Sequence, residues 1–433
     1  MQIVTLKELD FETYAKDHEY ASYYQTVEYG NVLKSMGFNV HYLGIKENDR
    51  LIGASLIVFK EIYMGKKIAY APHGILFDYN NKEKVIELGK NLKRVFGKQG
   101  FMIFRMNPYI PATVKDKRGR TINVNKDINS IMKNIKSAGF KYMGQNKYFE
   151  NELPRFEAIK LTDKPMNDIF KGLNKRIKHK IRRASGCGIT ILVDKEKKID
   201  ELYNFVKKKD IYSKKYLQAI VDNFNTSRLY YALLNTDSFV MEAKKRFEKE
   251  QETNNEYAKK IQNLRFANEK SRAKLLNKKM NSDKLLNVYK MDLVLATKLL
   301  EKYPKGLIIG GCLTVEYNNA SYIVIDGYNK GLSHLNANYL IKWYILDDIE
   351  GRGLKYLNMN AVAGNFGNKN PYKNLNDSKL EYDTNIVEYI GEFNLILKKL
   401  NYLIYKRIKK ENYQIKNDLK EKEDKKKWKT IMN

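Results

Sequence analysis

The chain has 433 residues, of which 43% are hydrophobic and 12% aromatic, so it is long enough for two folded domains and is not disordered as a whole. Its formal net charge is +30, from 80 basic and 50 acidic side chains. A charge of this size favours a polyanionic partner: nucleic acid, an anionic lipid surface or a phosphorylated substrate. Lysine enrichment through AT-rich coding is the competing explanation.

Cysteine spacing and hydropathy exclude several classes of protein. Neither Cys187 nor Cys312 has a neighbour at metal-ligand spacing, so we expect no zinc site and no disulfide scaffold. No run of about 18 apolar residues could span a membrane, and the first residues lack a signal-peptide pattern. We therefore expect a cytoplasmic protein, with peripheral contact at the inner face of the plasma membrane left open.

Residues 1–150 alternate strand-like and helix-like segments. Their β-branched and aromatic residues predict strands over 40–45, 51–59, 68–71 and 101–106. Apolar residues recur at helical spacing over 82–96, which predicts an amphipathic helix. Since no glycine-rich turn follows the first strand, the pattern excludes a Rossmann dinucleotide site.

A second block repeats this style in residues 155–235 and 304–375. Strands are predicted over 156–161, 189–193, 229–234, 306–315, 321–325 and 356–360, with a helix over 338–349. Two blocks of similar size indicate a duplicated fold, although no clear sequence repeat accompanies it.

Residues 236–303 interrupt the second block with dense charge, no Gly and no Pro. Apolar residues at spacings of three and four predict helix throughout. Because both flanks belong to one block, we expect an antiparallel helical hairpin about 45–50 Å long, turning near 268–271 or 281–283. Two interpretations stay open: a basic arm that contacts tRNA, or a solvated hairpin without a partner.

The run KGLNKRIKHKIRR at 171–183 concentrates positive charge, with seven Lys or Arg in thirteen residues. On a helix, Leu173, Ile177 and Ile181 form an apolar stripe, and the basic side chains point outward. The expected phosphate-binding residues are Lys175, Arg176, Lys178, Lys180, Arg182 and Arg183. Mutual repulsion of these charges favours an anion, and the phosphate of tRNA and the diphosphate of a precursor both fit. A merely solvated face is the alternative.

The tail from Lys406 onward is also basic and ends near Lys427-Trp428-Lys429. Such a segment fits an anionic lipid surface or a frayed, solvated helix.

Two single lysines stand out. Lys34 lies near the end of a largely apolar helix that is expected to begin near Thr26. Lys379 is expected near the end of an irregular segment, just before a strand-like run ending in VEYIG. A lysine placed like Lys379, close to a sheet, can stabilise an oxyanion. At both positions the alternative interpretation is an ordinary solvent-facing lysine. No Ser-His-Asp or Cys-His arrangement, Walker A loop or His-rich metal motif occurs, which argues against hydrolases, NTPases and metalloenzymes.

Together these stretches resemble the Fem family of peptidoglycan-bridge peptidyltransferases (FemABX) over about residues 3–405. The resemblance is carried by QTVEYGNVLKSMGFNVHYLGIK at 25–46, YAPHGILFDY at 70–79, MNPYIP at 106–111, KGLNKRIKHKIRRASGCGITI at 171–191 and VEYIGEF at 387–393. The order of these motifs and the helical insertion before the last strands add to it.

The resemblance implies an α/β (α+β) fold with two tandem GNAT-like domains and the hairpin inserted in the second. The expected division is 1–150 plus about 380–405 for the first domain, 151–235 plus 304–379 for the second, 236–303 for the arm and 406–433 for the tail.

It also implies a function: transfer of an amino acid from aminoacyl-tRNA to the stem-peptide amine of lipid II or of the UDP-linked pentapeptide, without a metal or nucleotide cofactor. The acceptor-binding residues would be Lys34, Tyr109, Lys214 and Tyr216.

The implied catalytic residues depart from the family pattern at two places. The Phe-Lys motif, whose Lys acts near the reacting carbonyl, corresponds to Ser378-Lys379. Where some members have a Tyr beside a glycine, this chain has Asp326 before Gly327, with Tyr328 after it. Lys379, Asp326 and Tyr328 are therefore the expected catalytic residues.

Two alternatives remain from the sequence. An acyl-CoA-dependent GNAT enzyme would need a pyrophosphate-binding loop, which DGYNKGLSHLN at 326–336 does not provide. A non-catalytic RNA- or membrane-binding protein would use the arm and the tail.

Overall fold

The structure is a computed structural model that describes residues 1–405 and 407, apart from 63–64, 147, 151, 210, 264–268 and 368. The chain divides into two compact units. Unit 1 comprises Met1–Ala158, Ala361–Asn376 and Asn385–Asn433, and unit 2 comprises Ile159–Asn360 and Asp377–Thr384. The expected basic tail lies outside the described residues, except for position 407.

The main sheet of unit 1 has the strand order β1-β2-β3-β4-β6-β17-β9, with β5 paired to β3. All its pairs are antiparallel except β4–β6. The strands are β1 (Gln2–Thr5), β2 (Asn39–Glu47), β3 (Arg50–Ile62), β4 (Lys66–Ala71), β5 (Leu76–Phe77), β6 (Phe101–Met106), β9 (Phe140–Tyr142) and β17 (Phe393–Ile396). The chain thus returns to unit 1 near its end, where β17 fits between β6 and β9.

Helices cover this sheet. They are α1 (Glu8–Lys16), η1 (Tyr23–Gln25), α2 (Val27–Ser35), α3 (Lys82–Lys98) and α4 (Ile128–Ser137). The Thr26 hydroxyl caps α2 by accepting a hydrogen bond from the backbone N–H of Tyr29. α3 buries Val85, Leu88 and Phe96 in a core shared with the sheet. A smaller antiparallel ribbon of unit 1 contains β7 (Pro111–Lys115), β8 (Thr121–Val124) and β16 (Asn385–Tyr389).

The sheet of unit 2 contains the consecutive order β11-β12-β13-β14-β15, antiparallel except for β14–β15. These strands are β11 (Ile189–Val193), β12 (Arg228–Leu234), β13 (Leu307–Tyr317), β14 (Ala320–Tyr328) and β15 (Tyr356–Ala361), and β10 (Phe156–Leu161) leads the chain into the unit. Its helical segments are α5 (Met166–Gly172), α6 (Lys175–Ser185), α7 (Asp200–Val206), η3 (Lys207–Lys209), α8 (Lys214–Asn223), η4 (Lys330–Leu335) and α11 (Ala337–Gly351).

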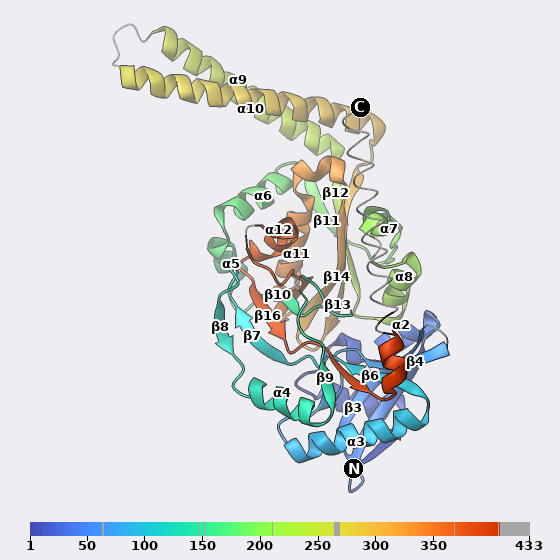
Figure 1. Cartoon of the computed structure of the whole chain (residues 1–433). Helices are drawn as coiled ribbons and strands as arrows, with labels where there is room; N and C mark the ends of the chain where they lie inside the picture. The colour runs from blue at the N-terminus through green and yellow to red at the C-terminus, as the bar shows by residue number, and fades with distance from the viewer. Residues whose placement is uncertain are drawn as a thin grey trace. The chain divides into compact units, whose positions relative to one another are not determined.

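The expected hairpin is confirmed as α9 (Thr236–Gln262) and α10 (Glu269–Lys302), which run beside each other in unit 2 (Figure 1). Asn254 of α9 donates to the hydroxyl of Ser282 on α10 at 3.1 Å, and both side chains are buried. The 34 residues of α10 correspond to a length of about 51 Å. The alternative prediction, that the hairpin turns at 281–283, was wrong because those residues lie inside α10.

Every strand expected between residues 40 and 360 is present, and so are the expected helices at 82–96 and 338–349. Two local predictions were wrong. The run 171–183 is not one helix, because Leu173 has an extended backbone and Asn174 caps a new helix. Lys379 does not follow an irregular segment but lies in the last turn of α12 (Lys373–Leu380). Throughout the described residues, we find no helix of the length and apolarity that crossing a membrane requires.

Candidate functional site

The carboxylate of Asp326 lies among lysine side chains in unit 2. Asp326 lies on β14 opposite Cys312 of β13, and 31% of its side chain is exposed. The ammonium of Lys342 on α11 donates to Asp326 Oδ2 at 2.5 Å, and only 3% of the Lys342 side chain is exposed. Lys209 donates to the backbone carbonyl of Asp326 at 2.7 Å and approaches Oδ1 at 3.8 Å. Two ammonium groups therefore hold one carboxylate.

This arrangement shifts the pKa values of the paired groups. Burial alone would raise the pKa of Asp326, but the charges of Lys342, Lys209 and Lys379 outweigh it and hold that pKa well below its usual range. Burial alone would lower the pKa of Lys342, but the Asp326 carboxylate raises it above its ordinary value. Both groups are therefore charged at neutral pH. A carboxyl of such low pKa accepts a proton poorly, which argues against Asp326 as a general base.

Lys379 belongs to this electrostatic cluster, since its charge lowers the pKa of Asp326. Its side chain is mostly buried, and its carbonyl accepts a hydrogen bond from the N–H of Tyr382, which ends the helix. Tyr328 is two residues beyond Asp326 on the same strand, and its backbone pairs with Gly310. The three expected catalytic residues therefore lie in one unit.

Close packing of α7 on the sheet explains the glycine beside Asp326. A Cβ at Gly327 would lie 2.6 Å from Val206 Cγ1 and 2.8 Å from Phe205 Cβ, so a side chain there would push α7 away. η3 follows α7 directly and carries Lys209. Lys209 and Lys342 were missed from the sequence. The signal for Lys342 is a lone lysine inside the apolar run LIKWYIL at 340–346.

The basic helix α6 uses its cations in two ways. Its apolar stripe is buried as expected. Lys180 packs over the ring of Tyr339 at 3.9 Å, donates to its hydroxyl at 2.7 Å and approaches Glu381 at 3.4 Å. Lys178 donates to the carbonyl of Lys171 at 2.8 Å. Lys175, Arg176 and Arg182 are exposed, and Arg176 also lies 3.3 Å from Glu381.

Arg183 does not point outward as expected. It reaches α10, where its guanidinium lies 3.2 Å from the carboxylate of Asp292, and 25% of Arg183 and 6% of Asp292 are exposed. This ion pair joins α6 to the arm within unit 2. Its position could not be read from the sequence, because Asp292 is 109 residues away.

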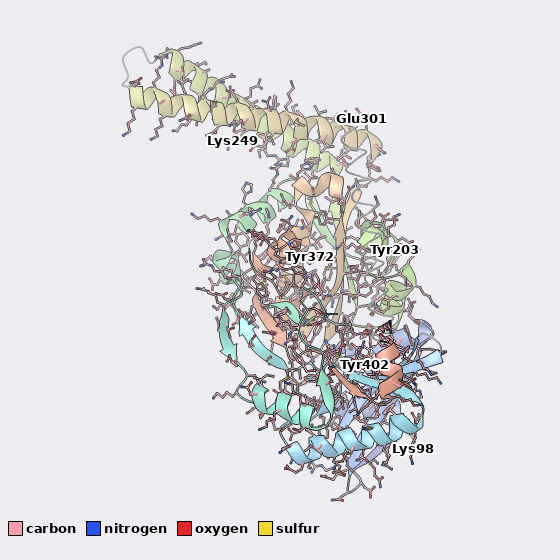
Figure 2. The ribbon with its side chains drawn as sticks, in the orientation of Figure 1. Lys98, Tyr203, Lys249, Glu301, Tyr372 and Tyr402 are labelled. Carbon is pink, nitrogen blue, oxygen red and sulfur yellow. The ribbon has the colours of Figure 1, made fainter. Side chains whose placement is uncertain are left out.

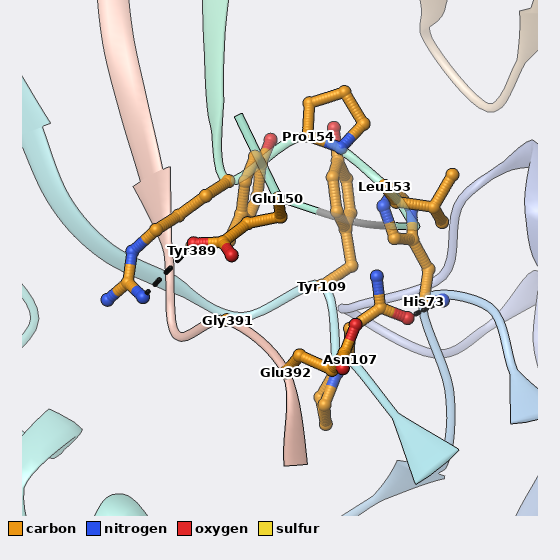
Figure 3. A pocket seen from close by; sticks show the side chains of 11 residues that line it. His73, Asn107, Tyr109, Glu150, Leu153, Pro154, Tyr389, Gly391 and Glu392 are labelled. Carbon is orange, nitrogen blue, oxygen red and sulfur yellow. Dashed lines mark hydrogen bonds and ion pairs between the residues drawn. The ribbon is translucent and has the colours of Figure 1, made fainter. Parts of the chain in front are cut away.

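A separate pocket lies in unit 1 around Tyr109 (Figure 3). The Tyr109 ring stacks between His73 and Tyr389 at centroid distances of 4.2 and 4.1 Å. Its hydroxyl donates to Glu157 at 2.8 Å. Burial lowers the pKa of His73 to about 3, so its imidazole is neutral and pairs with the Ser22 hydroxyl at 2.8 Å. His73 was missed from the sequence.

The opposite wall of this pocket is charged. Arg155 lies 3.2 Å from Glu388 and 3.8 Å from Glu150, and it donates to the hydroxyl of Tyr142 at 2.5 Å. Burial raises the pKa of Glu150, although the Arg155 charge opposes the shift. The site therefore combines a perturbed carboxyl with aromatic walls.

The other expected acceptor residues lie elsewhere in their units. Lys34 of unit 1 is exposed and forms an ion pair with Glu8 at 2.6 Å. In unit 2, Lys214 opens α8 and pairs with Asp200, while Tyr216 stacks on Tyr212 at 4.8 Å. Their roles stay predictions. Among the described residues, no group of three or more His, Cys, Asp or Glu side chains could hold a metal ion.

Comparison with known proteins identifies the family. Residues 6–410 match the FemAB family. The chain is 23% identical to aminoacyltransferase FemA of Staphylococcus epidermidis over 423 residues, which cover 95% of this chain and 99% of that protein. FemA of Staphylococcus aureus (strain bovine RF122 / ET3-1) has the same identity and coverage. The crystal structure of FemX superposes with a TM-score of 0.68 at 17% identity, covering 93% of this chain and 99% of that one. The expected mixed α/β fold is thereby confirmed, and the chain belongs to the FemAB family.

Proposed function

We propose that this protein transfers an amino acid from aminoacyl-tRNA to the stem-peptide amine of a peptidoglycan precursor. The observation that carries the proposal is the match to FemA aminoacyltransferases over 95% of the chain. Enzymatic acyl transfer follows from that relationship. The tRNA donor and the precursor acceptor are the parts that the proposal adds.

The reaction needs charge stabilisation rather than a nucleophilic side chain, because the ester of aminoacyl-tRNA is already activated. The acceptor amine attacks the ester carbonyl, the new amide bond forms, and the ester C–O bond breaks. The proton lost by the amine ends on the released ribose hydroxyl. A cation beside the tetrahedral oxyanion typically contributes about 3–4 kcal/mol to catalysis. Lys379 supplies that cation in our proposal.

Asp326 and Lys342 position this charge. The Asp326 carboxylate stays ionised and acts electrostatically on Lys379, while Lys342 neutralises it from the buried side. Asp326 is therefore a positioning residue in our proposal, and proton transfer passes through the substrates.

The donor tRNA is proposed to contact α6 and the arm. α10 carries nine Lys or Arg against four Asp or Glu, whereas α9 carries six of each. Positive charge thus concentrates on the helix to which Arg183 joins α6. Exposed lysines and arginines on adjacent helices can neutralise successive phosphates. Lys175, Arg176 and Arg182 are the α6 residues that we assign to this contact.

The acceptor is proposed to use the Tyr109 pocket of unit 1. Its stacked rings offer an apolar wall, and Asn107 and Glu150 add polar groups. The exposed ammonium of Lys34 is kept as a candidate for the acceptor phosphates. Tyr109→Phe should raise the KM for the acceptor more than it lowers kcat if its hydroxyl helps only to position the ligand.

The test is a transfer assay with the full chain. Purified protein is mixed with a pool of charged tRNAs and, in separate reactions, with lipid II or the UDP-linked pentapeptide, and products are identified by mass. The proposal predicts an acceptor heavier by one amino-acid residue, and the mass difference identifies the donor. Acetylation from acetyl-CoA in a parallel reaction, with no product from charged tRNA, would replace it with the CoA-dependent alternative. Binding of tRNA without any transfer would favour a non-catalytic protein.

A further inference from the structure

An open groove of about 550 Å³ lies in unit 1, and none of the described residues that line it also lines the Tyr109 pocket. It is bounded by α3, the turn between α4 and β9, the end of β17 and the helical residues 399–405. Figure 2 labels Tyr402 on this last helical segment, and Lys98 marks the end of α3. Nothing in the proposed transfer reaction uses this groove.

The floor of the groove is apolar and closely packed. Ile86, Ala138, Leu395 and Ile396 line it. A Cβ at Gly89 would lie 2.2 Å from the carbonyl oxygen of Ala138, so α3 contacts the α4–β9 turn directly and closes the floor there. An apolar ligand would therefore meet the side-chain carbon of these four residues.

The rim of the groove carries only positive charge. Lys90 and Lys93 come from α3, Lys141 from β9, and Lys399 begins the last helical segment, and all four are exposed. None of the described residues that line the groove is Asp or Glu. Four cations around an apolar floor are complementary to a ligand with an anionic head and a hydrocarbon body.

Two exposed leucines and an isoleucine extend the apolar surface at the edge of the groove. Leu400 is 71% exposed, Leu403 is 62% exposed and Ile404 is 50% exposed. Lysines flanking bulky apolar side chains are typical of segments that lie in a membrane interface, with the cations at the phosphates and the side chains in the acyl boundary. Burial of three such side chains would contribute binding energy that charge alone does not supply.

Three other occupants fit this groove less well, two of them because of charge and one because of the apolar surface. The chain segment 406–433 has eleven Lys or Arg against five Asp or Glu, so its own like charge opposes binding at this rim. A second copy of the chain would bring the same lysines opposite each other. A nucleic acid would satisfy the lysines but leave the apolar floor and the leucines exposed.

We propose that this groove and the leucines beside it dock the protein on anionic phospholipid at a bilayer surface, the lysines binding headgroup phosphates and the groove receiving acyl-chain carbon. The inference goes beyond the transfer reaction and does not depend on it. It requires no membrane-spanning helix.

Vesicle co-sedimentation of the full chain tests the inference. We expect binding to mixed phosphatidylglycerol–phosphatidylcholine vesicles and little binding to pure phosphatidylcholine. Lys90→Glu/Lys93→Glu should weaken binding about tenfold or more. Leu400→Ser/Leu403→Ser should also weaken it several-fold. The control Lys7→Glu/Lys16→Glu makes the same change in net charge at the two ends of α1 and should leave binding within about twofold of the original protein.

Three results would overturn the inference. An equal loss in the α1 control would indicate adsorption by net charge alone. A loss in the lysine variant without any loss in the leucine variant, together with competition by soluble glycerol phosphate, would indicate a site for a free anion. Dimerisation in sedimentation velocity that the leucine variant abolishes would assign the surface to a second copy. Unchanged circular dichroism and thermal unfolding show that each variant is folded, whether or not the transfer reaction is observed.

Discussion

At the scale of single residues, charge placement decides what the candidate site can do. Asp326 was expected to be catalytic from a resemblance, and the structure surrounds it with Lys342, Lys209 and the charge of Lys379. The sequence could indicate the acid and Lys379, because both fall at motif positions. It could not indicate Lys342 or Lys209 as partners, because those contacts depend on how α11 and η3 pack on β14.

The Asp326–Lys342 pair should contribute substantially to the stability of unit 2. Asp326→Asn leaves a buried ammonium without its counter-ion, and we expect a loss of about 3 kcal/mol, the lower end for a buried pair because Asp326 is partly exposed. Urea denaturation measures this loss. Asp347→Asn on the exposed side of α11 is the matched control and should change stability by less than about 0.5 kcal/mol. A loss of less than about 0.5 kcal/mol in Asp326→Asn would contradict a stabilising role of the Asp326–Lys342 pair.

His73 should make unit 1 sensitive to acid. Its pKa is about 3 in the folded protein and 6.5 when unperturbed, so the unfolded chain binds the additional proton between these values. The stabilisation is complete above pH 6.5 and is lost as the pH falls toward 3, by up to about 1.4 kcal/mol per pH unit. His73→Phe keeps a stacking ring without a titrating group. Its unfolding free energy should depend less steeply on pH between 6 and 4, and an unchanged slope would show that His73 is not the cause.

At the scale of elements, β-branched and aromatic content predicted the strands well, and 68 residues without Gly or Pro predicted the long hairpin. The prediction was less accurate where a single polar side chain decides where a helix begins. Asn174 accepts a hydrogen bond from the N–H of Arg176 and starts α6 anew, which splits the run that apolar spacing alone joined. The direction of Arg183 was missed for a related reason, since its partner belongs to a distant helix.

The Arg183–Asp292 pair should hold α10 against α6. Arg183→Ala leaves the buried carboxylate of Asp292 without this partner, at a cost of about 1–3 kcal/mol. We expect faster amide hydrogen exchange in α10 around Asp292. Arg182→Ala removes a neighbouring exposed guanidinium and should leave that exchange unchanged. Equal exchange in the two variants would contradict the anchoring role.

The exposed cations of α6 should contribute to tRNA affinity through counter-ion release. Lys175→Ala/Arg182→Ala is expected to weaken tRNA binding and to reduce the slope of log affinity against log salt by about 1.4–1.8, from 0.7–0.9 for each of the two phosphates that are no longer neutralised. Filter binding at several salt concentrations gives the slope. Lys195→Ala/Lys198→Ala, in the loop before α7, removes equal charge and should leave the slope unchanged. A slope unaffected by the α6 variant would remove this helix from the interface.

At the scale of the whole molecule, the family and its fold could be predicted because motif order survives at 23% identity over nearly the full chain. The local chemistry could not be predicted to the same extent. Sequence motifs identified Tyr109, but its stacking with His73 and Tyr389 depends on residues far apart in the chain. The roles proposed here therefore depend on contacts between residues far apart in the chain. The central role is that of Lys379, which acts on the reacting carbonyl in our proposal.

The rate of the transfer step tests that claim most directly. Single-turnover transfer from a charged tRNA to the precursor is measured for the original protein, Lys379→Ala, Lys379→Arg and the control Lys373→Ala on the first turn of α12. The account predicts a fall of about a hundredfold or more in Lys379→Ala, with acceptor affinity nearly unchanged, partial recovery in Lys379→Arg and an unchanged rate in Lys373→Ala. A normal rate in Lys379→Ala would contradict it.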